Sequence, residues 1–581
     1  MHRSLAPTIS RSTRFSKAVW RLVLGSVAGW SLACSGPASP AAAATNVAPR
    51  AGGTSAEISA ADLRERLFRI ADDSTMGRET GSVGAFATSA YVAGEFARLG
   101  LEPAGDNGGW FQVLPMWQLA ADPSSTLAVA SSGALTVFKD FMPSSSNAAT
   151  RTLTGAAVIY AGSISDTAKW IAPARAQGKV VLIQVPAGTS FRPVRPLAAR
   201  YRSALAVIIV GFEDVPAETV ARLREGQPVT DSFASPVALP SLWVTRRAAN
   251  TIIGHDIATA KPGDAGRALT GRFGYLRAAL PAQARNVVGI FRGSDAALRT
   301  QYVALTAHHD HVGFDHSPVD HDSLRAFNTV IRPMGADSPV REPTSAEWTR
   351  IRFKLDSLRR LYGKRLDSIR NGADDDGSGT ASILEIAEAF SRGLVKPKRS
   401  ILFVSHTGEE AGLLGSAWFT DHSTVPTDSI VAEIDQDMVG RGTATDFPRG
   451  GTGAGSDTYL EVIGAKRISK QFGDMLEQAN AKQSVPFVFD VTFDAPGHPL
   501  QYYCRADHYN YARYGIPAVA FSRGEHQDYH QVTDEAQYIS YPDLQRVSRM
   551  VFDAALLIAN APMRPKSDVP KPKDPHAQCR Q

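Results

Sequence analysis

The sequence predicts an α/β protein in which a β-sheet carries helices on both faces. From residue 286 onward, apolar runs of strand type (287–290, 302–306 and 400–405) alternate with helical stretches such as 381–390. This alternation is typical of sheets layered between helices. With 581 residues, the chain is also too long for one hydrophobic core, so we expect more than one domain.

Residues 1–44 have the layout of a secretory signal peptide, because basic residues precede an apolar run (22–33) and then small residues. The apolar run is too short for a membrane span. Cys34 follows Ser31-Leu32-Ala33, which is similar to a bacterial lipoprotein box with Leu one place nearer the Cys. Plain cleavage near Ala44 is the alternative, and an ordinary disordered N-terminus is a third. We expect an exported protein that is periplasmic, extracellular or lipid-anchored to the cell envelope.

The formal charge of +5 comes from the basic residues of this leader, which precede every acidic residue: Arg3, Arg11, Arg14, Lys17 and Arg21. The body that follows is neutral, so composition gives no support for a nucleic-acid partner. Membrane contact is expected only through a lipid on Cys34. Only Cys504 and Cys579 lie beyond the leader. That number excludes a disulfide framework and leaves a single bond between them open.

The next two regions differ in their pattern of apolar residues. Residues 45–123 are expected to begin the α/β domain, since apolar residues in 60–101 recur at helical spacing and suggest two amphipathic helices joined by a turn-rich link at 76–82. Residues 124–265 are expected to form an inserted, mostly β domain. Its short β-type runs are separated by Gly, Pro and Ser, and they lie at 155–160, 179–183, 206–210 and 241–245.

Residues 266–563 should complete the α/β domain, interrupted by a segment without strong strand signals at 314–370. Apolar residues from Trp348 to Ile369 recur every three or four positions after a Thr344-x-x-Glu347 capping box. This pattern predicts a helix of about six turns. Its Arg- and Lys-rich side is either a solvated face or part of a lid or dimerisation helix, so a dimer stays open. The Pro- and Lys-rich tail, 564–581, is expected to be flexible.

Candidate metal ligands follow the predicted strands in chain order. His308 comes after strand 302–306, Glu410 after strand 400–405, and Asp437 at the end of a strand that begins near Ile430. Asp375 and His530 lie in the polar turns 371–379 and 528–534. Sites in such sheets gather at the carboxyl ends of strands, so we expect these side chains to meet.

Two imidazoles and three carboxylates suit a pair of zinc ions, with Mn or Co as alternatives. They divide into one His and one terminal carboxylate per ion around a shared Asp, an arrangement that promotes hydrolysis. Glu409, beside Glu410, is our candidate for the general base and later proton donor to the leaving amine. Asp310 is our candidate acceptor for the second ring N–H of His308.

Each motif alone has a simpler interpretation. A single His-x-Asp or Glu-Glu is usually a loop or surface feature, and Asp-Asp-Gly-Ser-Gly could be a turn or a calcium loop. The combination in one order favours the metal centre. The remaining histidines nearby are poorer candidates, which we assign to the pocket wall, the surface or hydrogen-bonded loops: His309, His311, His316, His321 and His406.

At these motifs the chain resembles the co-catalytic dizinc exopeptidases of the leucyl aminopeptidase type. The resemblance covers about residues 60–120 and 285–560. It implies a three-layer zinc-exopeptidase fold with a central mixed, largely parallel sheet. It also implies that His308 and Asp437 bind one metal, that Glu410 and His530 bind the other, and that Asp375 bridges them with Glu409 as the base.

The same resemblance implies a cis peptide between Asp375 and Asp376 and a substrate pocket near Asp507, His508 and Tyr529. The chain has Ala506 where the family usually has Ser, and Asp435 where it has Asn. The β insert resembles a protease-associated domain. The long 314–370 segment departs from the family pattern.

These observations favour an aminopeptidase acting on peptides, with two zinc ions per chain. A carboxypeptidase or dipeptidase of the same fold is the alternative, because metal ligands do not determine which peptide end is recognised. Acidic pocket groups would hold an amine, whereas Arg would hold a carboxylate. Arg505, Arg513 and Arg523 keep that alternative open. A non-catalytic binding protein, as in the transferrin receptor, is a third.

Overall fold

The computed structural model describes residues 54–144, 150–187, 200–230, 239–339, 341–441 and 456–581. The predicted leader, with Cys34 and Ala44, lies outside these ranges. Among the described residues, no helix combines the length and the apolar character that crossing a bilayer would require.

A nine-stranded mixed sheet organises most of the chain, in the order β1-β14-β18-β15-β19-β22-β20-β21, with β2 beside β14. Its strands are β1 (Glu102–Pro103), β2 (Phe111–Val113), β14 (Arg285–Phe291), β15 (Tyr302–His308), β18 (Ser400–His406), β19 (Ile430–Gln436), β20 (Tyr459–Ile463), β21 (Val488–Asp490) and β22 (Ala518–Ser522). The neighbours β18, β15, β19 and β22 run parallel, whereas β14 and β20 pair with them antiparallel. The carboxyl ends of the four parallel strands therefore lie at one edge.

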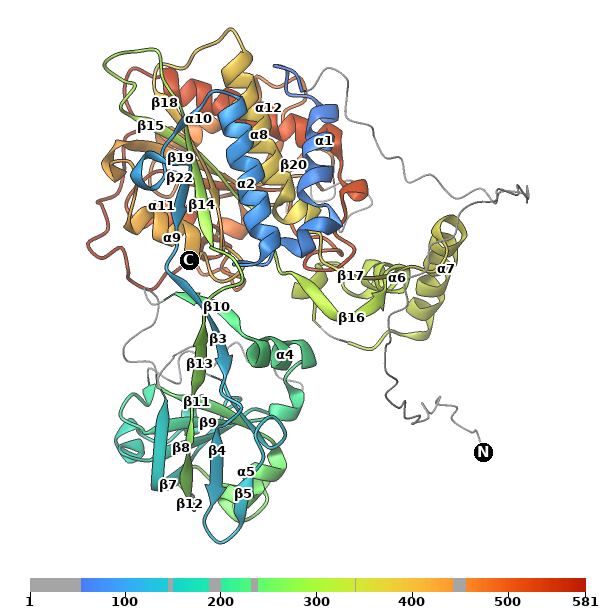
Figure 1. Ribbon diagram of the computed structural model, residues 1–581, viewed down its shortest axis with the longest axis vertical. Coiled ribbons are helices and arrows are strands. Elements are labelled where there is room, and N and C mark those ends of the chain that lie inside the picture. The colour runs from blue at the N-terminus through green and yellow to red at the C-terminus, as the bar shows by residue number, and fades with distance from the viewer. Residues whose placement is uncertain (1–53, 145–149, 188–199, 231–238, 340, 442–455) are drawn as a thin grey trace, which may run out of the picture. The chain divides into compact units, whose positions relative to one another are not determined.

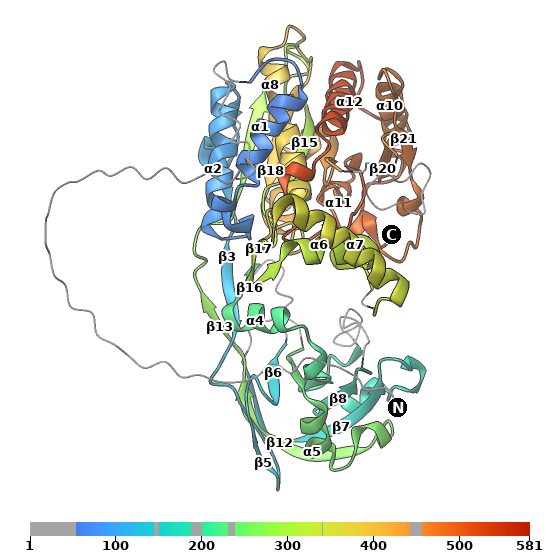
Figure 2. The same cartoon turned by 90° about the vertical axis from the view of Figure 1, so that its right-hand side faces the viewer.

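Helices cover both faces of this sheet (Figures 1 and 2), as the alternation of strands and helices predicts. Val303 and Leu305 pack into one core, which also holds α1 (Ala60–Ile70), α2 (Val83–Arg98), α8 (Gly379–Arg392), α10 (Lys470–Ala481) and α12 (Tyr541–Asn560). Ala304 points to the opposite face. There it joins a second core with α9 (Leu414–Asp421) and α11 (His508–Ala512). The α/β fold with three layers is confirmed.

Helix α1 is also joined to α8 by buried charges. Arg66 is 1% exposed and forms ion pairs with Glu385 at 3.0 Å and with Glu388. It also pairs with Glu95 of α2 at 2.5 Å. One guanidinium therefore connects the two N-terminal helices to the helix that follows the Asp375 turn.

A second, eight-stranded sheet lies between residues 126 and 273, in the order β5-β4-β12-β7-β8-β9-β11-β6. Its strands are β4 (Thr126–Val129), β5 (Gly133–Leu135), β6 (Phe141–Pro143), β7 (Arg151–Ser163), β8 (Val180–Gln184), β9 (Ala206–Val210), β11 (Ser241–Val244) and β12 (Ala265–Phe273). Leu182 and Ile208 share its core with α5 (Arg246–Ile253). The four β-type runs predicted here are strands, and β12 extends the sheet beyond residue 265. Its relation to protease-associated domains stays a prediction.

A third, three-stranded sheet joins β10 (Gln227–Thr230) and β13 (Tyr275–Ala278) to the edges of β3 (Met116–Ala121). Helix α4 (Ala217–Glu225) precedes β10. This sheet contains the chain segments that enter and leave the eight-stranded sheet.

The 314–370 segment contains α6 (His321–Ile331) and α7 (Ser345–Tyr362), flanked by the paired strands β16 (Phe314–Asp320) and β17 (Leu366–Ile369). The capping box at Thr344 is confirmed. The predicted helix end was wrong, because Gly363 adopts φ 73° and ends α7 before Leu366. Leu366 and Ile369 have helical spacing from the preceding apolar residues, but they lie in β17.

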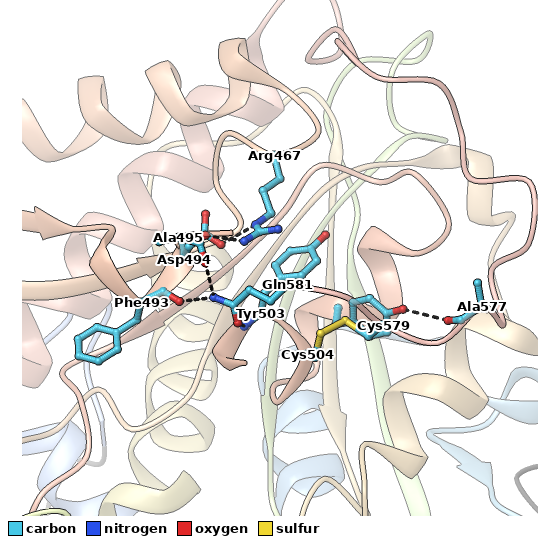
Figure 3. The surroundings of a disulfide bond; sticks show 10 residues. Arg467, Phe493, Asp494, Ala495, Tyr503, Cys504, Ala577, Cys579 and Gln581 are labelled. Carbon is cyan, nitrogen blue, oxygen red and sulfur yellow. Dashed lines mark hydrogen bonds and ion pairs between the residues drawn. A yellow bond between two sulfur atoms is a disulfide. The ribbon is translucent and has the colours of Figure 1, made fainter. Parts of the chain in front are cut away.

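The tail that we expected to be flexible is attached to the body of the protein. Cys504 and Cys579 form a disulfide bond, with Cα atoms 5.9 Å apart. The backbone N–H of Tyr503 donates to Oε1 of Gln581 at 3.1 Å, and the side-chain amide of Gln581 donates to the carbonyl of Phe493. Figure 3 shows these contacts around the bond. Composition favours flexibility here, but the covalent bond and these hydrogen bonds fix the segment.

Candidate metal centre

The parallel strands deliver the predicted ligands to one edge of the central sheet. His308 is the last residue of β15, and Asp437 follows the last residue of β19. Glu410 comes shortly after β18, where Gly408 adopts φ 76° and turns the chain. Because β15 pairs in parallel with both β18 and β19, these positions are neighbours.

Two donor groups form around Asp375. In the first, His308 Nε2 lies 3.3 Å from Asp375 Oδ1 and 3.6 Å from Asp437 Oδ1. In the second, His530 Nε2 lies 3.0 Å from Asp375 Oδ2 and 3.0 Å from Glu410 Oε2. The two oxygens of Asp375 thus face different groups. The structure brings together all five side chains that the sequence predicted as ligands.

The donor atoms fit divalent cations. His308 Nε2, Asp375 Oδ2 and Glu410 Oε1 are buried and make no hydrogen bond. Leaving such atoms without partners is costly, so their convergence requires a compensating ligand. Imidazoles and carboxylates at these separations suit zinc, with Mn or Co as chemical alternatives.

Opposite charges dominate the electrostatics of the second group. Burial on its own raises the pKa of Glu410, but His530 and His311 outweigh it and lower that pKa to about 2. Burial lowers the pKa of His530, whereas Glu410 and Asp375 raise it to about 10. The imidazoles and carboxylates stabilise each other's charged forms, and a bound cation would replace the imidazole protons.

Glu409 lies between the first donor group and the pocket. Its Oε2 is 4.0 Å from His308 Nε2, and its backbone N–H donates to Asp310 Oδ1 at 3.3 Å. Burial, followed by the charges of Glu410 and Asp437, raises the pKa of Glu409 well above its usual value. The carboxylate of Glu409 would therefore reach a water molecule or substrate atom that lies next to His308 Nε2.

Asp310 differs from the expectation in the atom that it presents. His308 Nδ1 lies 3.1 Å from the backbone carbonyl of Asp310, while the nearer carboxylate oxygen is 3.7 Å away. The carboxylate accepts a hydrogen bond from Thr80 Oγ1 at 2.6 Å and the N–H of Glu409. Asp310 therefore orients the turn around Glu409 as well as His308.

The side chain of Arg78 holds the turn that carries Asp375 through hydrogen bonds to backbone carbonyls. The buried guanidinium of Arg78 donates to the carbonyls of His309 at 2.9 Å, of Gly372 at 2.8 Å, and of Asn371. The peptide bond between Asp375 and Asp376 is cis, as the resemblance implies. Asp376 accepts the N–H of His308 at 3.1 Å and the N–H of Gly379 at 2.9 Å, so backbone groups engage both of its carboxylate oxygens.

His311 also reaches the second donor group, although we had assigned it to the pocket wall, the surface or a loop. Its Nδ1 lies 2.9 Å from Glu410 Oε1 and 3.7 Å from Asp375 Oδ2. The signal in the sequence is its place three residues after His308, in the same turn. His321, with Asp367 and Glu535, forms another candidate group. There Arg365 donates to both His321 and Asp322, which leaves little need for a metal.

A pocket opens beside Asp375, Glu409 and Asp437. Of the predicted pocket residues it includes Tyr529, but not Asp507 or His508. Asp507 is buried and accepts a hydrogen bond from Ser416, and His508 packs against Tyr503 with ring centroids 5.3 Å apart. Both side chains are buried, Asp507 directly before α11 and His508 as its first residue. The remaining lining residues are Met438, Glu461, Ile463, Tyr502, Arg505, Ala506, Ala520, Ser522, Glu525 and His530.

The 314–370 segment supports this pocket. The N–H of Ala336 donates to the carbonyl of Tyr529 at 3.0 Å, and Asp337 pairs with Arg505 Nη1 at 2.9 Å. Arg325 of α6 pairs with Asp528, two residues before His530. The inserted segment therefore holds the loop that carries a ligand and part of the pocket wall.

Comparisons with known proteins agree with this arrangement. Residues 286–555 match the model of peptidase family M28. Leucine aminopeptidase 1 of Coccidioides posadasii is 31% identical over 202 residues, covering 33% of this chain and 47% of the relative. A probable zinc metalloprotease of Pyricularia oryzae is 25% identical over 233 residues, covering 35% and 46%. The chain thus spans about half the length of these curated relatives.

Solved structures give a weaker likeness. An aminopeptidase from Aneurinibacillus sp. strain AM-1 aligns with a TM-score of 0.49 and 18% identity, covering 89% of this chain and 97% of that one. A zinc aminopeptidase from Bacillus subtilis aligns at 0.47 and 17%, covering 86% and 95%. The match of residues 286–555 to the model of peptidase family M28, together with the leucine aminopeptidase relative, confirms the resemblance to co-catalytic zinc exopeptidases that the motifs indicate.

Proposed function

We propose that the protein is an exported metallo-aminopeptidase that removes N-terminal residues from peptides, with two zinc ions and Glu409 as the general base. The observation that carries the proposal is the pair of donor groups sharing Asp375 beside a pocket that contains Glu409, Glu461 and Glu525. When bound, two such ions polarise a peptide carbonyl and lower the pKa of water.

The chain's own residues supply the proton transfers. Glu409 Oε2, 4.0 Å from His308 Nε2, is placed to take a proton from the attacking water. The same carboxyl then gives that proton to the leaving amine. Burial and neighbouring carboxylates raise the pKa of Glu409, which favours its uptake of the proton in the first step.

The charge of the pocket favours a substrate ammonium group. Glu461 and Glu525 line it, and Tyr502 donates to Glu525 Oε1 at 2.7 Å. Two of the arginines that could have held a carboxylate are engaged elsewhere. Arg513 pairs with Asp421 at 2.5 Å, and Arg523 donates to the carbonyl of Arg441 at 2.6 Å. Carboxylates near the metals would hold a free N-terminus.

Arg505 keeps a carboxypeptidase or dipeptidase as the second candidate, because it does line the pocket. Its charge is partly neutralised by Asp337 at 2.9 Å. A purely binding role has less support, since the full set of donor side chains is present.

Export is supported by the Cys504–Cys579 bond, because disulfides persist in oxidising compartments. Lipid attachment at Cys34 and plain cleavage near Ala44 both remain proposals. Mass spectrometry of the N-terminus of the native protein separates them: a diacylglyceryl Cys34 supports anchoring, and an unmodified N-terminus beyond it supports release.

The experiment that tests the proposal compares three matched peptides, one with a free N-terminus, one with a blocked N-terminus and one with an amidated C-terminus. We expect chelator-sensitive release from the first and third only. Glu409→Gln should lower kcat by about 10²–10⁴-fold while still binding two zinc ions. Cleavage of the blocked peptide, but not of the amidated one, would instead show a carboxypeptidase. No cleavage by a zinc-loaded protein would contradict the enzymatic role for these substrates.

A further inference from the structure

His311 is a buried imidazole that faces two carboxylates of the second donor group. Its side chain is 0% exposed, and Nδ1 faces Glu410 Oε1 at 2.9 Å and Asp375 Oδ2 at 3.7 Å. Neither ring nitrogen makes a hydrogen bond of normal geometry, and neither do those two carboxylate oxygens. The atoms converge on one another without bonding, as ligand atoms around a cation do.

The surroundings confine the ring to this place. Gly372 has φ 55°, and a Cβ there would lie 2.5 Å from Cγ of His311. Arg78 donates to the carbonyl of Gly372 at 2.8 Å, and the carbonyl of Arg78 accepts the N–H of His311 at 3.0 Å. On another side, the edge of the His530 ring meets His311 with centroids 5.4 Å apart.

We propose that His311 is a fourth protein ligand of the ion held by Glu410, His530 and the bridging Asp375. The inference rests on the proposed two-metal function. Ligand atoms about 2.0–2.2 Å from a tetrahedral zinc ion lie about 3.3–3.6 Å apart. The separations within this group, 2.9, 3.0, 3.0 and 3.7 Å, fall around that spacing.

The two ions would then differ in their number of protein ligands. The first group offers three donor residues, His308, Asp375 and Asp437, while the second offers four. Four protein ligands are typical of closed structural sites, and three protein ligands with an open position are typical of catalytic ones. The ion beside His311 is therefore the more tightly bound, and the open position belongs to the ion beside His308 and Glu409.

Zinc titration under chelator competition tests this inference without measuring activity. Wild type should show two affinities. His311→Ala should weaken the tighter one by more than the roughly 10–100-fold that outer partners of metal ligands contribute. The matched control is His309→Ala, since His309 is buried in the same turn but its ring contacts Ser405 Oγ at 2.9 Å. His309→Ala should bind zinc with the same two affinities as wild type.

X-ray absorption on wild type loaded with one equivalent of zinc gives a second test that needs no variant, in case His311→Ala fails to fold. Two imidazoles around that ion support the inference, and one imidazole overturns it. Unchanged zinc affinities in folded His311→Ala also overturn it. Failure of the proposed function would look different: wild type would bind zinc as expected but cleave none of the three peptides, or would bind no zinc.

Discussion

His508 shows how one buried side chain sets a pH dependence. Neither of its ring nitrogens has a hydrogen-bond partner, and burial, with a smaller contribution from Arg467, lowers its pKa to about 3. The unfolded chain takes up the proton near pH 6.5. Stability is therefore present above pH 6.5 and is lost as the pH falls from there toward 3.

We expect His508→Leu to remove this dependence. At pH 5 the neutral buried imidazole costs wild type about 2 kcal/mol relative to pH 7. Urea unfolding at several pH values should give a shallower loss for His508→Leu. His255→Leu, at a position whose side chain is 44% exposed, should follow wild type. Parallel pH curves for wild type and His508→Leu would show that His508 is not the group responsible.

Single residues also show what the sequence could reveal. His308, Glu410 and Asp437 could be predicted because each follows a recognisable strand, and parallel strand ends share one edge. Both His309 and His311 follow His308 closely and both are buried, so only the course of the turn after β15 decides which ring faces Glu410 and which faces Ser405. Glu461 and Glu525 carry no motif, and only the folding of β20 and the loop after β22 brings them to the pocket.

At the scale of elements, Arg66 joins α1 and α2 to α8. Arg66→Met should cost about 3–5 kcal/mol, because Glu385 and Glu388 would stay buried without a counter-ion. The free energy of unfolding in urea measures this. Arg69→Ala, on the exposed side of α1, should change stability by less than about 0.5 kcal/mol. A loss for Arg66→Met as small as that of the control would mean that water reaches the two carboxylates.

The inserted segment is the second element whose role can be tested. Asp337→Asn would leave the charge of Arg505 less neutralised and so weaken the binding of a substrate ammonium group. We expect KM for a free N-terminus to rise about tenfold, which corresponds to about 1.4 kcal/mol, while kcat stays nearly constant. Steady-state kinetics checks this. Arg359→Ala, which breaks an exposed pair with Asp320 at 2.7 Å in the same segment, serves as the control.

A lower KM, or an equal change in both variants, would contradict a pocket role for Asp337.

The segment 314–370 also shows where sequence patterns mislead. Its apolar spacing continues without a break from α7 into β17. The change from helix to strand depends on the conformation of Gly363 and on pairing with β16, which lies far back in the sequence.

At the scale of the whole molecule, the Cys504–Cys579 bond closes a loop with a sequence separation of 75. Loop-closure entropy predicts that removing it costs about 4 kcal/mol. Thermal unfolding with and without reductant should therefore differ for wild type but not for Cys504→Ser/Cys579→Ser. A reductant-insensitive wild type would mean that the hydrogen bonds of the tail suffice.

The position of that bond also determines when it can form. Cys579 leaves the ribosome 75 residues after Cys504, and the segment it captures carries the pocket residues Tyr502 and Arg505. During synthesis, and for as long as the chain stays in a reducing cytoplasm, this part of the pocket wall is not held by the disulfide bond. Under the proposed export, we expect the pocket wall to gain this covalent link only after delivery to an oxidising compartment.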